Sequence, residues 1–146
     1  MVLSPDFKEF IALLNTHSVR FLVVGGYAVA FHGHPRYTKD LDIWIDNEQE
    51  NADRLMRVLD AFGFGSVGLA AQDFLTPHRT IQLGYPPNRI DLLTSMKAVD
   101  FAACYTAKVT TELEGVTVDF IDLANLKRNK RAVGRHEDLA DLDNLE

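Results

Sequence analysis

Two aspartates one residue apart, Asp40 and Asp42, have the type and spacing that metal-dependent chemistry requires. Side chains two residues apart in an extended segment point the same way, so these carboxylates would lie side by side while Leu41 and Ile43 face the core. Two neighbouring anions repel each other, and a divalent cation compensates the repulsion. Hard oxygen ligands suit Mg²⁺, with Mn²⁺ as the alternative ion. The pattern therefore predicts a metal site for nucleotide chemistry.

A third carboxylate, Asp91, lies inside an apolar strand-like run between Ile90 and Leu92. A charged side chain in such a run is costly to bury unless it is paired. We therefore expect Asp91 to face Asp40 and Asp42, and the three acids to be both the catalytic residues and the metal ligands.

Two other interpretations of the third acid stay open. Asp91 could be an exposed residue of an edge strand. Asp119, in the strand-like run 116–121, is the rival third acid, although it shares a face with Thr117 that looks solvent-directed.

A glycine pair, Gly25 and Gly26, follows the apolar run 21–24 and precedes a short helical pattern. Glycine lets the backbone approach a ligand closely, and the amides that open a helix attract anions. The pair is therefore a candidate phosphate-binding turn. A plain tight turn between strand and helix is the alternative.

Three residues just before the carboxylates, Arg36, Thr38 and Lys39, are further candidates for phosphate binding. If a strand begins at Asp40, Arg36 and Thr38 fall on the same side as the acids, and a planar guanidinium suits bidentate recognition of phosphate. The alternative is that Arg36 or Lys39 neutralises the aspartates in a structural ion pair.

The densest group of basic residues lies near the C-terminal end, and from it Lys130 and Arg135 are our candidates for holding a triphosphate or an RNA backbone. Such a basic helix is more often a solvated face. The full group is Lys127, Arg128, Lys130, Arg131 and Arg135.

These residues need a scaffold of alternating strands and helices. The pattern predicts an α/β (α+β) fold, a mixed sheet of about five strands with helices packed on it, in which the strands starting at Phe21, Asp40 and Arg89 are adjacent. Helical patterns begin after Ser4-Pro5 and at Asn47, Lys97, Asp122 and His136, and strand patterns cover 20–24, 40–46, 79–83, 89–93 and 116–121.

Composition bounds the class of protein. The chain has 146 residues, a net charge of −6 and one cysteine, Cys104. It has no apolar run near the roughly 20 residues of a membrane helix. The acidic balance argues against a nucleic-acid coat protein, and we expect no membrane and no DNA partner. A single cysteine fits a reducing, cytoplasmic location.

Taken in order, the glycine pair, the Asp40-Leu41-Asp42 segment and the in-strand Asp91 resemble the motif of the polymerase-β-type nucleotidyltransferase superfamily. Residues from Arg36 to Asp42, and from Lys127 to Leu142, look like its small prokaryotic stand-alone branch, which is similar to AbiEii-type toxins. One departure is that Gly26 stands where many members have a serine.

This resemblance implies one minimal nucleotidyltransferase domain over residues 1–146. It also implies Mg²⁺- or Mn²⁺-dependent transfer of a nucleotide from a nucleoside triphosphate to an RNA, tRNA or protein hydroxyl. A cognate toxin or antitoxin partner is expected in that branch. Two alternatives are a non-catalytic nucleotide- or partner-binding module of the same fold, and a structural domain whose aspartates are caps and surface charges.

Overall fold

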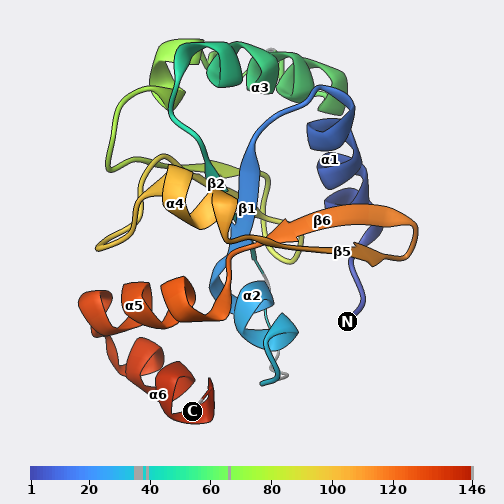
Figure 1. Ribbon diagram of the computed structural model, residues 1–146. Helices are drawn as coiled ribbons and strands as arrows, with labels where there is room; N and C mark the ends of the chain where they lie inside the picture. The colour runs from blue at the N-terminus through green and yellow to red at the C-terminus, as the bar shows by residue number, and fades with distance from the viewer. Residues whose placement is uncertain (35–37, 39, 66, 146) are drawn as a thin grey trace.

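The computed structural model describes residues 1–34, 38, 40–65 and 67–145. Its described residues form a mixed six-stranded sheet with strand order β3-β4-β2-β1-β6-β5 (Figure 1). The strands are β1 (Phe21–Val24), β2 (Leu41–Ile45), β3 (Thr80–Leu83), β4 (Ile90–Leu93), β5 (Val109–Leu113) and β6 (Val116–Phe120). The helices are α1 (Pro5–Thr16), α2 (Gly25–Phe31), α3 (Gln49–Phe62), the 3₁₀ turn η1 (Ala71–Phe74), α4 (Phe101–Thr106), α5 (Leu123–Val133) and α6 (His136–Leu145).

The mixed sheet predicted from the sequence is confirmed, with one strand more than expected. The additional strand, β5, pairs antiparallel with β6 at the edge of the sheet. Its residues are exposed or half-buried, so it lacks the apolar alternation that marks a half-buried strand. The turn between the two strands uses Glu114 and Gly115, both with positive φ.

The three central strands lie next to one another as predicted. β2 pairs antiparallel with β1, with Val24 opposite Asp42, and parallel with β4, with Asp42 opposite Asp91. Because β2 is in the middle, residues at its start are brought near both the end of β1 and the start of β4.

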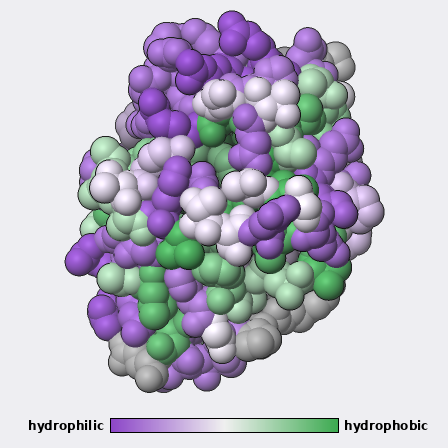
Figure 2. Space-filling model, turned by 45° about the vertical axis from the view of Figure 1, so that its right-hand side comes forward, coloured by the Kyte–Doolittle hydropathy of each residue, from purple (hydrophilic) through white to green (hydrophobic). Residues whose placement is uncertain are grey.

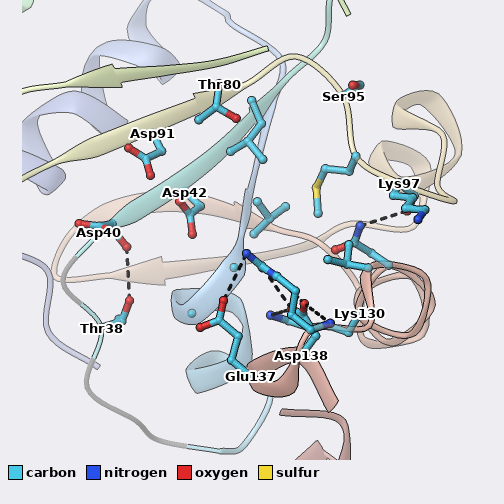
Figure 3. Close-up of a pocket in the computed structure, with 18 of the residues that line it drawn as sticks. Thr38, Asp40, Asp42, Thr80, Asp91, Ser95, Lys97, Lys130, Glu137 and Asp138 are labelled. Carbon is cyan, nitrogen blue, oxygen red and sulfur yellow. Dashed lines mark hydrogen bonds and ion pairs between the residues drawn. The ribbon is translucent and has the colours of Figure 1, made fainter. Parts of the chain in front are cut away.

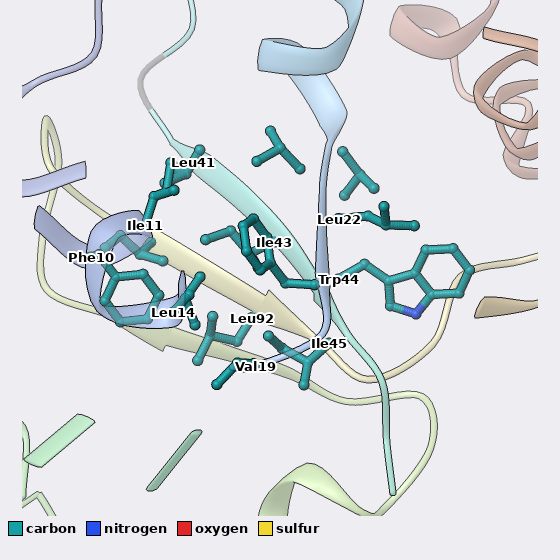
Figure 4. Packing of buried hydrophobic residues seen from close by; sticks show 14 of the residues in the cluster. Phe10, Ile11, Leu14, Val19, Leu22, Leu41, Ile43, Trp44, Ile45 and Leu92 are labelled. Atoms are coloured by element: carbon teal, nitrogen blue, oxygen red, sulfur yellow. The ribbon is translucent and has the colours of Figure 1, made fainter. Parts of the chain in front are cut away.

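Side chains of β2 alternate between the two faces of the sheet. Leu41, Ile43 and Ile45 are buried on the face covered by α1, where Figure 4 shows the helix side chains beside them. Trp44 lies on the opposite face, with its ring 5.1 Å from that of Phe101 in α4. Asp42 shares the Trp44 face by the same alternation.

Helix α1 begins as its sequence predicts. Ser4 accepts a hydrogen bond from the amide of Phe7, and Pro5 occupies the first helical turn. The helix buries one apolar stripe against the sheet, comprising Phe7, Phe10, Ile11 and Leu14. This stripe fixes one face of the central strands and leaves the other face for the site.

Helix α3 covers the end of the sheet away from the start of β2, and hydrophilic side chains gather over that end of the molecule (Figures 1 and 2). It starts at a cap from Glu48 and ends at Gly63, whose φ is +101°. No helix in the described part of the chain is long and apolar enough to cross a bilayer.

Helices α5 and α6 pack on each other beside α2 (Figure 1). Asp122 caps the start of α5, and Gly134, with φ +69°, ends it in the left-handed conformation. The short connection turns the chain back so that the first turn of α6 lies against the last turns of α5.

Candidate functional site

A cavity of about 720 Å³ lies between the central strands, the start of α2 and the α5–α6 pair (Figure 3). The residues predicted to be catalytic, Asp40, Asp42 and Asp91, all line it. Gly25, Gly26, Thr38, Lys130 and Arg135 line the same cavity. The structure thus brings together eight of the ten predicted site residues, and their roles stay predictions.

Asp42 and Asp91 lie side by side because β2 and β4 are parallel and in register. Burial raises the pKa of Asp42 to about 7, and the nearby carboxylates of Asp91 and Asp40, together with a hydrogen bond to Asp91, raise it in the same direction. Lys130 partly opposes this shift. The site therefore concentrates more negative charge than its own neighbours neutralise.

Arg89 connects two of the three acids. Its Nη2 atom lies 2.7 Å from Oδ2 of Asp40, and its Nε atom lies 3.0 Å from Oδ1 of Asp91. The Nη2 atom also lies 3.2 Å from Oδ2 of Asp91. The guanidinium therefore bridges carboxylates that come from different strands.

Gly25 allows the backbone to approach Asp42. It has φ +66°, and a Cβ built at this position would lie 2.1 Å from Oδ2 of Asp42. A side chain at Gly25 would therefore need the carboxylate to move. Gly26 is buried in the first turn of α2.

The fit of these residues to a divalent ion can be judged from their donors. The cluster offers only carboxylate oxygens, the ligands that Mg²⁺ prefers. Oδ1 of Asp40 is buried without a hydrogen-bond partner among the described residues, which leaves one acceptor that a cation would satisfy. Across the described ranges, no set of three or more His, Cys, Asp or Glu side chains is already spaced to hold a metal. The donors suit a divalent ion by their chemical type, and Arg89 bridges two of the three acids.

Of the predicted phosphate-binding residues before the acids, Thr38 is described. Its hydroxyl lies 3.4 Å from the carbonyl oxygen of Asp40, and Figure 3 shows it on the side of the cavity opposite Lys130. Arg36 and Lys39 lie outside the described residues.

Lys130 is buried, with its Nζ atom 3.2 Å from Oδ1 of Asp138 and 3.0 Å from Oδ2 of Asp141. Arg135 donates from Nε to Asp138 at 2.8 Å and pairs with Glu137 at 3.3 Å. Burial opposes ionisation of Asp138, but hydrogen bonds from Arg135 and Lys130 outweigh it and lower its pKa. Both predicted cations therefore line the cavity while held by acids of α6.

The rival third acid, Asp119, has partners elsewhere. It accepts a hydrogen bond from Thr110 at 2.6 Å and pairs with Lys108 at 3.4 Å. Thr110 lies in β5, and Lys108 immediately precedes that strand. Both partners are therefore at the β5 edge of the sheet.

The sequence analysis missed Arg89 and Asp138 as site residues. Arg89 could have been found, because it precedes Asp91 by two residues and alternation puts both on one face. Asp138 gives no such signal, because it meets Lys130 only after the chain has turned at Gly134.

Comparison with known proteins identifies the family and the fold. The family model for aminoglycoside-2''-adenylyltransferases matches residues 6–145. No curated protein sequence gives a significant match.

Two solved structures share the fold. A candidate nucleotidyltransferase from Thermotoga maritima superposes with a TM-score of 0.64 at 16% identity, covering 98% of this chain and 94% of the other. An antigenic nucleotidyltransferase-like protein from Paracoccidioides brasiliensis gives a TM-score of 0.56 at 16% identity, covering 98% and 77%. At these identities the likeness shows the fold alone.

Proposed function

We propose, from the premise that the chain belongs to the aminoglycoside-2''-adenylyltransferase family, that it transfers a nucleotide from a nucleoside triphosphate to an acceptor hydroxyl with the help of a divalent metal ion. The observation that carries the proposal is the convergence of Asp40, Asp42 and Asp91 on one cavity beside Gly25. The family description makes ATP the first donor to test.

In this proposal the three acids bind the metal ion, and one of them also acts as the general base. Asp40, Asp42 and Asp91 would hold Mg²⁺ or Mn²⁺, which when bound neutralises the charge of the reacting phosphates. Asp91 is the most buried residue of the three and would accept the proton of the acceptor hydroxyl at a carboxylate oxygen. Its strand, β4, is paired with β2 on one side and β3 on the other, which would hold that oxygen in position.

The basic residues and the glycine turn would bind the phosphates of the nucleoside triphosphate. Lys130 and Arg135 would supply positive charge from the α5–α6 side of the cavity. Gly25 keeps the backbone close to Asp42, so the phosphates and the carboxylate could share the space between them. Thr38 would contact the phosphates from the opposite side, and Arg36 and Lys39, which lie outside the described residues, stay candidate phosphate-binding residues from the sequence.

For the acceptor we propose a cationic small molecule, with aminoglycosides as the first class to test because the family is described by them. A net charge of −6 favours a cation over a polyanion. Lys130 and Arg135 are both paired with acids, so the basic helix offers less positive charge to RNA than its sequence suggests. An RNA, tRNA or protein hydroxyl is the comparison acceptor.

Two further proposals rest on the sequence motif. One is an AbiEii-like role with a cognate toxin or antitoxin. The other is a module of the same fold that binds a nucleotide or partner without catalysis. Both are outcomes of the test below.

The test is a transfer assay with α-labelled ATP, GTP, CTP and UTP, each with Mg²⁺ and one acceptor class: aminoglycosides, total tRNA or cell-extract protein. Label on an aminoglycoside, lost in Asp42→Asn, is the expected result. Asp119→Asn is the matched control because it makes the same change outside the cavity.

Label on tRNA or protein instead would support the comparison acceptors and the toxin-like role. Nucleotide binding without label transfer would support the non-catalytic module. Transfer that persists unchanged in Asp42→Asn would contradict the proposed site.

A further inference from the structure

Arg89 holds the site together without being one of its acids. Its guanidinium contacts Asp40 at 2.7 Å and Asp91 at 3.0 and 3.2 Å. The guanidinium thus joins Asp40, just before β2, to Asp91 in β4 along the lining of the cavity. A hydrogen bond that Arg89 donates to Asp91, together with the charges of Asp91, Asp40 and Asp42, stabilises its charged form.

Two facts distinguish this contact from a permanent structural ion pair. The side chain of Arg89 is 27% exposed, so water reaches it and can replace its hydrogen bonds. Arg89 also lines a second cavity of about 620 Å³, beside Leu83 and Tyr85 at the sheet edge. Arg89 therefore borders open space in both cavities.

Arg89 contacts Oδ2 of Asp40 and both carboxylate oxygens of Asp91, and leaves Oδ1 of Asp40 as the buried oxygen without a hydrogen bond among the described residues. A metal ion that binds Asp40 and Asp91 together competes with the guanidinium at Asp91, because Arg89 holds both oxygens of that carboxylate. In the absence of metal, Arg89 supplies the positive charge that keeps the acids together. Its planar fork also suits a phosphate, so it has a second anionic partner once a triphosphate is present.

We propose that Arg89 is an exchangeable internal counter-ion: it holds Asp40 and Asp91 in the free protein, yields them to the divalent ion, and then binds the incoming triphosphate. Arg89 is thus a positioning residue that couples metal binding to nucleotide binding. The metal alone binds weakly because it must displace Arg89. It binds more tightly when a bound triphosphate accepts the hydrogen bonds of the Arg89 guanidinium. This inference rests on the proposed function and deepens it.

The test measures binding and not turnover. Mn²⁺ is titrated into the full chain and followed by electron paramagnetic resonance, with and without the non-hydrolysable analogue α,β-methylene-ATP. The variant is Arg89→Gln, which keeps a polar side chain but removes the charge. Arg89→Lys, which keeps the charge but loses the two-pronged contact, provides a second reading if the glutamine variant folds poorly.

In the wild type we expect the analogue to strengthen Mn²⁺ binding by about tenfold or more, the size expected when a charged hydrogen bond is exchanged. Arg89→Gln is expected to bind Mn²⁺ alone about tenfold more tightly than the wild type, and to gain less from the analogue. Arg89→Lys is expected to lie between the two. Arg54→Gln removes the same charge from α3 at the far end of the sheet and should match the wild type.

The outcomes separate the two proposals. Wild-type protein that binds Mn²⁺ with the analogue, while Arg89→Gln binds Mn²⁺ alone no more tightly than the wild type, would overturn the counter-ion role and leave the proposed function standing. Wild-type protein that binds no Mn²⁺ in either condition would overturn both. Equal strengthening by the analogue in wild type and Arg89→Gln would also contradict the coupling.

Discussion

The backbone of Gly25 lies so close to Asp42 that a Cβ on the glycine would stand 2.1 Å from Oδ2 of the carboxylate. The glycine also has φ +66°, a conformation that other residues rarely adopt. One residue thus meets two demands, a left-handed turn at the end of β1 and the absence of a side chain beside the acid.

Gly25→Ala is therefore expected to displace Asp42 and to reduce nucleotide transfer by about a hundredfold, the usual cost of misplacing a catalytic group by about 1 Å. The left-handed backbone adds about 1–2 kcal/mol of lost stability. Transfer rate and urea denaturation of the purified variant measure the two effects.

The variant Gly115→Ala separates the loss of transfer rate from the loss of stability. Gly115 has φ +83° in the β5–β6 turn, and a Cβ there would meet nothing within 4 Å. This variant should lose similar stability and keep its transfer rate. Equal activity losses in both variants would show that the effect of Gly25 is only conformational strain.

Asp42 should make the protein less stable as the pH rises. Its native pKa is raised from an ordinary 3.8 to about 7, so the folded chain holds the proton more tightly than the unfolded chain. The unfolded state therefore binds fewer protons between these values, and stability falls as the pH rises through that window. The loss is complete above about pH 7.

Asp42→Asn removes this loss because the amide does not ionise. In EDTA at about pH 8 we expect the variant to be about 2 kcal/mol more stable than the wild type, after discounting for partial exposure, and near pH 4 the difference should vanish. Urea denaturation at both pH values measures it. Asp119→Asn should bring no such gain, and a pH-independent difference for Asp42→Asn would refute the cause given.

Lys130 should matter for stability as well as for phosphate binding. Its ammonium is buried against Asp138 and Asp141, and removal of one member of a buried ion group leaves the other charges uncompensated. Lys130→Met is therefore expected to cost about 3 kcal/mol in the free energy of unfolding.

Lys127→Met makes the same change on the same helix at a half-buried position and should cost much less. Adding Asp138→Asn and Asp141→Asn to Lys130→Met should recover part of the loss, because it removes two buried negative charges that have lost the Lys130 ammonium. If the triple variant is no more stable than Lys130→Met, lost packing and not electrostatics explains the cost.

Much of the fold could be predicted because local chemistry agrees with it. The Ser4 cap, the apolar run of β1 and the paired acids of β2 each carry a direct signal. Strand β5 could not be found from alternation because it buries too little apolar surface. The Glu114-Gly115 turn was the signal available for that hairpin.

The site was less predictable where partners are distant in sequence. The convergence of Asp42 and Asp91 follows from strand adjacency, which the spacing of motifs indicated. The sequence made Lys130 a candidate for phosphate binding, with a solvated basic face as the alternative, and neither interpretation includes its burial against acids of α6. That pairing depends on how α5 and α6 fold back on each other, which helical periodicity does not specify.

The most direct test of the three-acid site is a crystal structure of the protein with Mn²⁺ and α,β-methylene-ATP, with the metal located by its anomalous scattering. We predict anomalous peaks about 2.1 Å from oxygens of Asp40, Asp42 and Asp91, with Arg89 released from Asp40. Mn²⁺ bound elsewhere, with Arg89 still bridging Asp40 and Asp91 beside the bound nucleotide, would contradict the account.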